Sequence, residues 1–431
     1  MRIKALKKML LILALTAPCS TVYAEDVPAY SWDDCVRTAL VKNPDLASSR
    51  EAVSQKEAVK GITRSSLLPQ ISASASGGKT KSGPELAGSD ATNNYSYGLT
   101  AKQLVFDGFK SVYDLKGADK DILTARYDYS VTSGTVRFNL KQAYVSLLKN
   151  REMLKILEEI KERRKHIMNL VKLKYEAGSE HRGSYYTAKA DYLQSEADLK
   201  SALREVSLSK KTLCYLMGLD ESSQFSIGGD LTLTGTYDDK PDFSVLAAKT
   251  PAYLKSVSTS ESALYSMKSS RLAFSPEVYG TASAGKSGDS INNISANNWS
   301  VGFEITAPLF EGGSTWYASS KAESAYRQAL SGEKSVKNEV MKSLEESWNS
   351  LKDSIDNVEV QKASLDAALE RSKIGEARYS IGTLSFDNWT IIESNLASAK
   401  KTYHEACAAS LTAEARWIQS TGGTLDNESK K

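Results

Sequence analysis

The chain has 431 residues, of which 41% are hydrophobic and 25% charged, proportions that are typical of a folded protein and exclude a chain disordered throughout. Its 55 basic and 52 acidic residues leave a formal net charge of only +3, and they form no basic block. The composition therefore gives no support to nucleic-acid binding.

The first residues predict a secretory signal peptide over 1–24. Basic side chains come first, an uncharged apolar run follows over 9–17, and short side chains precede a cleavage position after Ala24. A lipoprotein site at Cys19 is the competing interpretation, but Pro18 stands where a small residue is preferred. We therefore expect export and cleavage after Ala24.

The mature chain has no apolar run of the roughly 18 to 20 residues that a membrane-spanning helix needs. If the protein lies in a membrane, its membrane-embedded part must therefore consist of β-strands. Three cysteines remain after cleavage, an odd number that cannot form a complete disulfide framework. We expect Cys35, Cys214 and Cys407 to be buried thiols on helices.

The mature chain repeats itself, and such a repeat determines how the rest is interpreted. We expect a first repeat at 25–220, a connection at 221–241, a second repeat at 242–421 and a polar tail at 422–431. Paired motifs carry the correspondence: Asn43 and Pro44 match Thr250 and Pro251, Phe106 to Gly108 match Phe310 to Gly312, and Tyr175 to Gly178 match Tyr379 to Gly382.

Each repeat is expected to begin with short helices. The spacing of Ser31 and Asp34 is that of a capping box and predicts a helix over about 32–42. Asn43 and Thr250 are capping residue types that precede a proline, so a helix is expected to begin at each.

Strict alternation of apolar and polar residues then predicts two strands per repeat, at about 68–79, 94–105, 275–286 and 298–309. In the last of these, Trp299, Val301 and Phe303 share one face, opposite Ser300 and Glu304. The intervening segments 80–94 and 287–298 are rich in Gly, Ser, Asn and Asp, as is typical of exposed hairpin ends.

After each strand pair the apolar period becomes helical, as at Val336, Val340 and Leu344, and predicts long coiled-coil helices. The first would run from about Lys110 to Tyr175, a length of roughly 100 Å at 1.5 Å per residue. Each long helix is expected to end at a glycine, Gly178 or Gly382, from which a second helix returns.

Four strands with one apolar face cannot close a membrane barrel, since the smallest such barrels have about 8 strands, but three chains would supply 12. A soluble sheet packed against helices is the alternative. The nearly all-polar second face favours a water-filled lumen, and aromatic residues fit an interfacial girdle; these are Tyr95, Tyr97, Trp299 and Phe303.

The order and duplication of these motifs resemble the TolC-like outer-membrane efflux family over essentially the whole mature chain. The motifs are Leu-Leu-Pro-Gln at 67–70, Val-Phe-Asp-Gly at 105–108, Leu-Phe-Glu-Gly-Gly at 309–313, and Tyr-x-x-Gly at 175–178 and 379–382. The resemblance implies a mixed α and β membrane protein whose homotrimer forms a 12-stranded barrel and a 12-helix periplasmic tunnel. It also implies docking with a periplasmic adaptor and an inner-membrane transporter, and passive export without catalytic residues, cofactors or metals.

The resemblance further implies functional residues at the helical tips. Gly178, Ser179, Gly382, Thr383 and Leu384 align with turns that contact the adaptor. Tyr379 aligns with a position near the closed entrance. Family members carry acidic residues six and nine positions after the second tip glycine; here these positions are Asn388 and Ile391, so Asp387 and Asn388 are the candidate gate residues beside Tyr379.

Other functional classes find less support. His166, His181 and His404 have no neighbouring Cys or His at ligand spacing, and the chain contains no nucleophile-elbow or phosphate-loop motif. A non-channel periplasmic coiled-coil scaffold or adaptor is the alternative from another class. It would share the long helices, but would not need four amphipathic strands.

Overall fold

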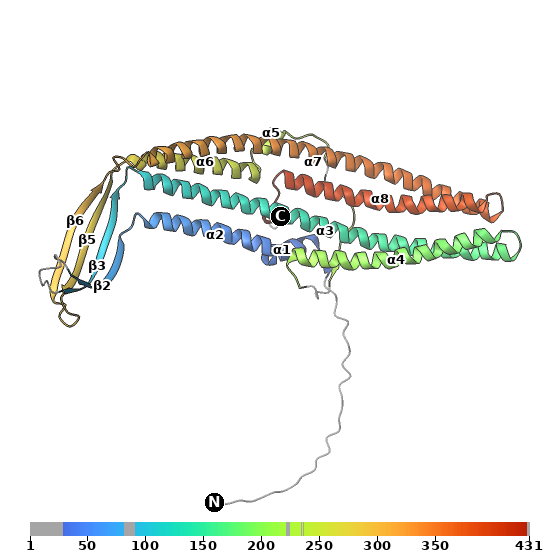
Figure 1. The fold of residues 1–431 in the computed structure, drawn as a ribbon. Coiled ribbons are helices and arrows are strands. Elements are labelled where there is room, and N and C mark those ends of the chain that lie inside the picture. Colours follow the sequence, from blue (N-terminus) through green and yellow to red (C-terminus); the bar gives the residue numbers. More distant parts are fainter. Residues whose placement is uncertain (1–28, 82–90, 221–224, 234, 236, 429–431) are drawn as a thin grey trace, which may run out of the picture.

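The computed structural model describes residues 29–81, 91–220, 225–233, 235 and 237–428. The fold is mostly helical and elongated, with a small sheet at one end and two helical hairpins at the other (Figure 1). The predicted signal peptide lies outside the described residues, as do most of the predicted loop at 80–94 and part of the connection at 221–241.

Capping residues and prolines define the short helices, α1 (Trp32–Lys42), α2 (Pro44–Ser65) and α6 (Pro251–Arg271). Ser31 and Asp34 form the predicted capping box at α1, and the Asn43 side chain accepts from two backbone N–H groups of α2. Thr250 stands at the N-cap of α6, but its hydroxyl donates to the carbonyl of Ala247 over 2.9 Å and does not cap the helix.

Four antiparallel strands form one sheet in the order β2-β3-β5-β6. They are β2 (Gln70–Thr80), β3 (Thr92–Phe106), β5 (Glu277–Gly288) and β6 (Ala296–Thr306). Strand β6 ends three residues short of the predicted 309, because Pro308 has no N–H to donate to a ladder. The pairing of β3 with β5 joins the first half of the chain to the second.

The strand register sorts side chains by polarity. Directly paired residues point to the same face of a sheet, and in the middle of this sheet they align apolar with apolar and polar with polar. One apolar row is Ile71, Ala101, Ala282 and Val301, and the adjacent polar row is Ser72, Thr100, Ser283 and Ser300. On the polar face Lys102 forms an ion pair with Glu304 over 3.1 Å and lies 4.0 Å from the centre of the Tyr279 ring.

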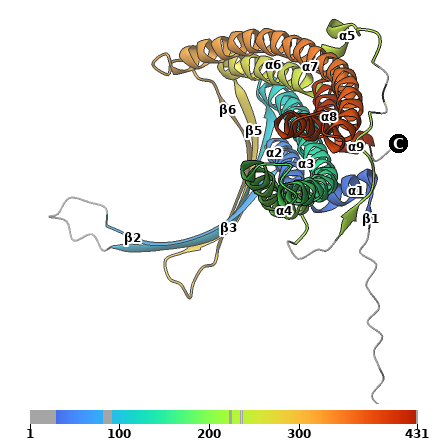
Figure 2. The same ribbon diagram turned by 90° about the vertical axis from the view of Figure 1, so that its right-hand side faces the viewer.

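Four long helices form two hairpins, α3 (Lys110–Glu176) with α4 (Arg182–Met217) and α7 (Ser314–Ser380) with α8 (Phe386–Ser420). Viewed from the hairpin end, the helices form a bundle from which the sheet curves away to one side (Figure 2). None of the helices in the described part of the chain combines the length and the apolar character needed to cross a membrane.

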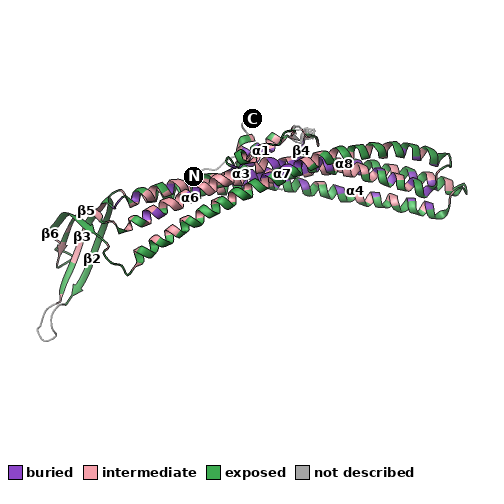
Figure 3. Cartoon of the chain, turned by 90° about the horizontal axis from the view of Figure 1, so that it is seen from above, coloured by how far each residue is buried: buried purple, intermediate pink, exposed green. Residues whose placement is uncertain are grey.

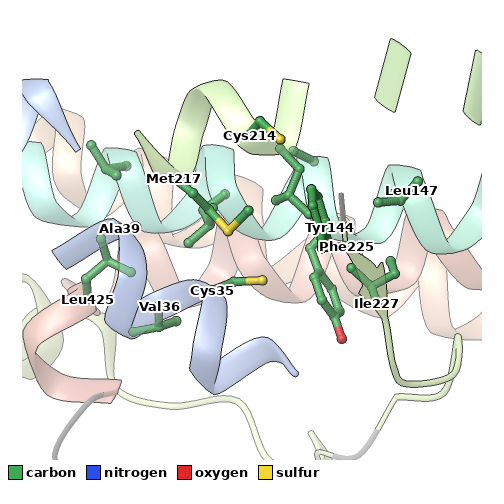
Figure 4. Close-up of a cluster of buried hydrophobic side chains, with 14 of the residues drawn as sticks. Cys35, Val36, Ala39, Tyr144, Leu147, Cys214, Met217, Phe225, Ile227 and Leu425 are labelled. Atoms are coloured by element: carbon green, nitrogen blue, oxygen red, sulfur yellow. The ribbon is translucent and has the colours of Figure 1, made fainter. Parts of the chain in front are cut away.

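Buried residues concentrate in the helical part, whereas every residue of β2 and β6 is exposed (Figure 3). The largest core cluster joins α1, α3 and α4 near the middle of the molecule and includes Cys35, Tyr144 and Met217 (Figure 4). Burial raises the pKa of the Cys35 thiol to about 12. Cys214 and Cys407 are buried on α4 and α8, as expected.

Small elements complete this central region. They are the paired strands β1 (Ala29–Tyr30) and β4 (Ser226–Ile227), helix α5 (Phe243–Ala247) and helix α9 (Leu425–Glu428), whereas the single-turn helix η1 (Leu272–Phe274) lies between α6 and β5. Within the predicted polar tail, Leu425 is fully buried, and Glu428 accepts from Trp32 Nε1 over 2.7 Å and pairs with Arg137. The end of the chain therefore ties α1 to α3.

Candidate functional site

Both helical hairpins turn in the same way. Gly178 and Gly382 have φ values of +75° and +78°, the left-handed conformation that glycine adopts most easily. At the first tip the amide of Gly178 donates to Tyr175 over 3.0 Å and that of Ser179 to Lys174 over 2.9 Å. The amides of Gly382 and Thr383 make the equivalent bonds at the second tip. These pairs of bonds are Schellman caps, so the Tyr-x-x-Gly spacing encodes the turns.

The helices that return from the tips are capped by different side chains. At α4, His181 Nδ1 accepts from the amide of Ser184 over 3.2 Å. At α8, Ser385 Oγ accepts from the amide of Asn388 over 3.4 Å. Each cap satisfies an N–H group that the first helical turn leaves without an intrahelical partner.

Tyr379 lies at the centre of a buried cluster that joins the two tips. Its side chain is 2% exposed and its ring stacks on Trp389 with 4.2 Å between ring centres. The other buried members come from both hairpins; they are Ile167, Val171, Ala188 and Phe386. The tip of α7 and α8 is therefore held to that of α3 and α4 by apolar packing as well as by polar contacts.

Two charged residues of the first hairpin bind Tyr379 directly. Lys174 Nζ donates to the Tyr379 carbonyl over 2.8 Å and lies 4.0 Å from the centre of its ring. The Tyr379 hydroxyl donates to Glu180 Oε2 over 3.3 Å. Burial, and then the Glu180 carboxylate, raise the pKa of Tyr379, so its phenol is neutral at physiological pH and able to donate.

The other predicted residues lie on the surface of the tips. Gly178, Ser179, Gly382 and Thr383 are exposed, and Leu384 is half-buried against the Tyr379 cluster. Asp387 and Asn388 are exposed in the first turn of α8, where a carboxylate interacts favourably with the helix dipole. The structure therefore brings Tyr379 and Leu384 together and leaves Asp387 and Asn388 outside their cluster.

A polar contact farther from the tips was not predicted from the sequence. Arg163 on α3 binds both carboxylate oxygens of Glu393 on α8, with Nη2 to Oε1 at 2.9 Å. The same Nη2 donates to Ser372 Oγ over 2.8 Å and pairs with Glu376 over 3.2 Å, both on α7. The sequence feature that could have pointed to this contact is the position of Arg163, a charged residue within the apolar stripe of α3.

The site consists of noncovalent contacts between helices. In the described residues no three His, Cys, Asp or Glu side chains are grouped so that they could hold a metal ion. The contacts that converge here are the packing of aromatic rings, a hydrogen bond from the Tyr379 hydroxyl, and ion pairs between the two hairpins. Such contacts can hold two rigid elements together and can be broken without any covalent change.

Comparison with known proteins identifies the family. The family model described as outer membrane efflux protein matches residues 35–219 and 247–423. The outer membrane efflux protein BepC of Brucella suis biovar 1 is 22% identical over 371 residues, covering 81% of this chain and 78% of BepC. The pyoverdine export outer membrane protein OpmQ of Pseudomonas aeruginosa is 26% identical over 157 residues, 34% of this chain and 33% of OpmQ.

Solved structures share the fold. The CmeC outer membrane channel of Campylobacter jejuni has a TM-score of 0.82 at 19% identity, covering 92% of this chain and 88% of its own. VceC of Vibrio cholerae has a TM-score of 0.81 at 18% identity, covering 91% and 96%. The resemblance inferred from the motifs is thus confirmed: the chain belongs to the outer membrane efflux protein family, whose members are channels of the Gram-negative outer membrane and not enzymes.

Proposed function

We propose that the chain is one protomer of a homotrimeric exit duct. Three copies would contribute twelve strands to one closed barrel in the outer membrane and twelve helices to a periplasmic tunnel. The observation that carries this proposal is the sheet itself: among the described residues, β2 and β6 each pair with one neighbour only, which leaves two edges of unpaired backbone groups. Because lipid cannot satisfy such groups, pairing of β2 with β6 of the next copy is the expected solution.

The two faces of the sheet support this arrangement. Trp299, Val301 and Phe303 are 78%, 74% and 80% exposed in the single chain, an apolar surface suited to lipid. The opposite rows carry serine, threonine, Lys102 and Glu304, as a water-filled lumen requires. A periplasmic scaffold, the alternative function, would have no use for an exposed apolar face of this kind.

The division of the chain into two repeats belongs to the same proposal. Two strands, a long helix and a returning helix follow one another twice, and α3 and α7 each have 67 residues. The two segments matched by the family model support a division into repeats at 25–220 and 242–421. Residues 1–24 would be the signal peptide, 221–241 the connection and 422–431 the tail.

The tips would serve as both gate and docking site. In the gate we assign Tyr379 the role of holding the hairpins together, since its contacts to Glu180 and Lys174 link them. Exposed Asp387 and Asn388 would face the narrowed entrance, where threefold symmetry would gather three copies of each. The turns at the two tips would contact the adaptor, through the exposed Gly178, Ser179, Gly382 and Thr383 and the half-buried Leu384.

The partners follow from this architecture. A tunnel without its own energy source must receive substrate from an energised inner-membrane transporter, and a periplasmic adaptor would join the two. Such a duct would serve tripartite efflux or type I secretion. The chain would move substrate passively through its lumen.

Light scattering of the detergent-extracted protein, corrected for bound detergent, tests the proposal. We expect the mass of a trimer, together with ion conduction after reconstitution into planar bilayers. A stable monomer that keeps its full β content would contradict the shared barrel.

A further inference from the structure

The apolar core of the helical hairpins is interrupted along its length. One buried cluster surrounds Tyr379 at the tips, and a second lies on α3 and α4 farther from the tips. The buried members of the second cluster are Ile156, Leu157, Ile160 and Ala202. Between the two clusters, Arg163 interrupts the apolar stripe of α3. Apolar packing is therefore not continuous from one cluster to the next.

A cavity of about 180 Å³ lies in this gap, between α3, α4 and α8. Helix α3 runs beside both of the others (Figure 1). In the cavity wall, Ile167, Ala188 and Trp389 belong to the tip cluster, Ile160 belongs to the second cluster, and Ala397 packs against the second. Protein interiors contain few voids larger than a water molecule, so a space of this size is unusual.

The cavity extends from the protein surface into the core. Trp389 and Ala188 in its wall are 1% and 2% exposed, whereas Glu159 and Ser394 in the same wall are exposed side chains. A small molecule can therefore enter from solvent and then lose most of its contact with water. Burial of apolar surface in this way favours binding.

Two residues of the cavity wall carry buried polar atoms that lack a partner. Among the described residues, neither Trp389 Nε1 nor Thr390 Oγ1 has a hydrogen-bond partner. Leaving a buried polar group in this state is unfavourable. The indole N–H can only donate, whereas the hydroxyl can donate or accept. The site therefore favours a ligand that carries a hydrogen-bond acceptor such as a carbonyl oxygen.

The charges of the cavity wall balance one another. They belong to three basic and three acidic residues, Arg163, Arg164, Lys400, Glu159, Asp191 and Glu393. Arg163 pairs with Glu393, and Lys400 pairs with Glu159 over 2.6 Å. An ion that entered this site would lose its hydration without gaining an excess of opposite charge. The wall therefore favours an uncharged ligand.

The volume and the apolar part of the wall define the size of the ligand. An apolar cavity of about 150 Å³ binds one benzene molecule. The cavity of about 180 Å³ has Ile160, Ile167 and Leu396 in its wall. It therefore has room for one aromatic ring with one small polar substituent.

We propose that this cavity is a binding site for an uncharged molecule with one aromatic ring and a carbonyl group. The ring lies among Ile160, Ile167 and Leu396, and the carbonyl oxygen accepts from Trp389 Nε1. The bound molecule contacts α3, α4 and α8 together, so it stabilises the arrangement in which the two hairpins are joined. This last effect rests on the proposed channel function and makes the ligand an inhibitor of opening.

Titration of benzamide into the detergent-extracted full-length protein tests the site. The protein would carry fluorotryptophan, and the fluorine resonance of Trp389 would be assigned with Trp389→Phe. We expect a saturable change of this resonance with a Kd on the order of 1 mM, as the limited affinity of such small ligands implies. Benzoate has nearly the same shape but carries a charge, and should bind at least about 10-fold more weakly.

Two alanines of α8 give a matched pair of variants. Ala397→Leu fills part of the cavity and should weaken benzamide binding by at least about 10-fold. Ala399→Leu makes the same change at a residue outside the cavity wall, and should bind benzamide like the parent. Thr390→Val keeps the shape of the side chain and removes its hydroxyl, so it should weaken binding by about 2- to 10-fold.

Conductance in planar bilayers measures the effect on the channel. If benzamide binds only the closed arrangement, a concentration of about ten times its Kd should lower the ratio of open to closed channels by about 10-fold. Ala399→Leu should respond in the same way, and Ala397→Leu should not respond at that concentration.

The outcomes separate the binding site from the channel function. The site is overturned if the folded parent shows no saturable change, if benzoate binds as tightly as benzamide, or if folded Ala397→Leu and Thr390→Val both bind like the parent. A parent that conducts equally with and without bound benzamide would overturn the inhibitory effect. A parent that binds benzamide and never conducts would overturn the proposed function and leave the binding site supported.

Discussion

The two ends of the protomer treat large apolar side chains in opposite ways. At the helical tips, Tyr379 and Trp389 are 2% and 1% exposed and lie among residues of the same chain. In the sheet, Val301 and Phe303 are 74% and 80% exposed. One chain thus completes the core of its tip by itself, whereas its sheet leaves large apolar side chains uncovered, as at surfaces that contact lipid or other chains.

The largest change in stability is expected from a substitution at the helical tips. Trp389→Ala removes the ring that stacks on Tyr379 and should destabilise the joined tips by about 3–5 kcal/mol, the usual cost of deleting a buried aromatic side chain. Hydrogen exchange should accelerate in the last turns of α3 and α7, while the sheet stays protected. Equal acceleration in the sheet would show that the two ends are not independent.

The sheet should respond to charge on one face only. Val301→Arg places a cation on the proposed lipid face and should disfavour insertion by about 2–4 kcal/mol near the bilayer midplane. Thr306→Arg places it on the polar face, where it should be tolerated and change conductance. Folding and insertion titrations of both variants measure the difference, and equal defects would reject the assignment of the faces.

A smaller effect is expected at the exposed residues of the tip. Asp387→Asn should change stability by less than about 1 kcal/mol, because the carboxylate is exposed in the first turn of α8, where its interaction with the helix dipole is weak. Three copies around one axis should nevertheless make its charge important for ions. We therefore expect lower cation selectivity and weaker block by a trivalent cation applied from the periplasmic side, with trimer formation unchanged.

Unchanged selectivity and block would assign the constriction to other residues. Asn388 would then be the next position to substitute, since it lies in the same exposed first turn of α8. Tyr379 would be tested with it, because its ring is buried and its contribution would act through contacts between the tips.

Local patterns predicted the backbone well. Helices begin at Pro44 and Pro251 because proline suits the first turn of a helix. The tips turn at Gly178 and Gly382 because the turn requires a residue with a positive φ, which glycine adopts most easily. Alternation along the strands anticipated the rows of the sheet, since side-chain direction there has a period of two. Each of these features depends on a few consecutive residues, so a single chain segment contains the information.

Contacts between distant segments were not predictable in the same way. The pairing of Arg163 with Glu393 joins residues 230 positions apart, and only the meeting of three helices explains it. The burial of Tyr379 likewise depends on residues of the opposite hairpin. A polar residue within an apolar stripe could have marked Arg163 as unusual, but it could not have named its partners.

Cross-linking between the two edges of the sheet tests the central claim, one barrel shared by three chains, most directly. Each variant would carry two introduced cysteines, one on β2 at a position within 72–76 and one on β6 at a position within 298–302. The variants would be oxidised in the intact membrane. The account predicts covalent dimers and trimers for the pairs in register, and monomers when only one edge carries a cysteine. Cross-links confined within single chains at every register would contradict it.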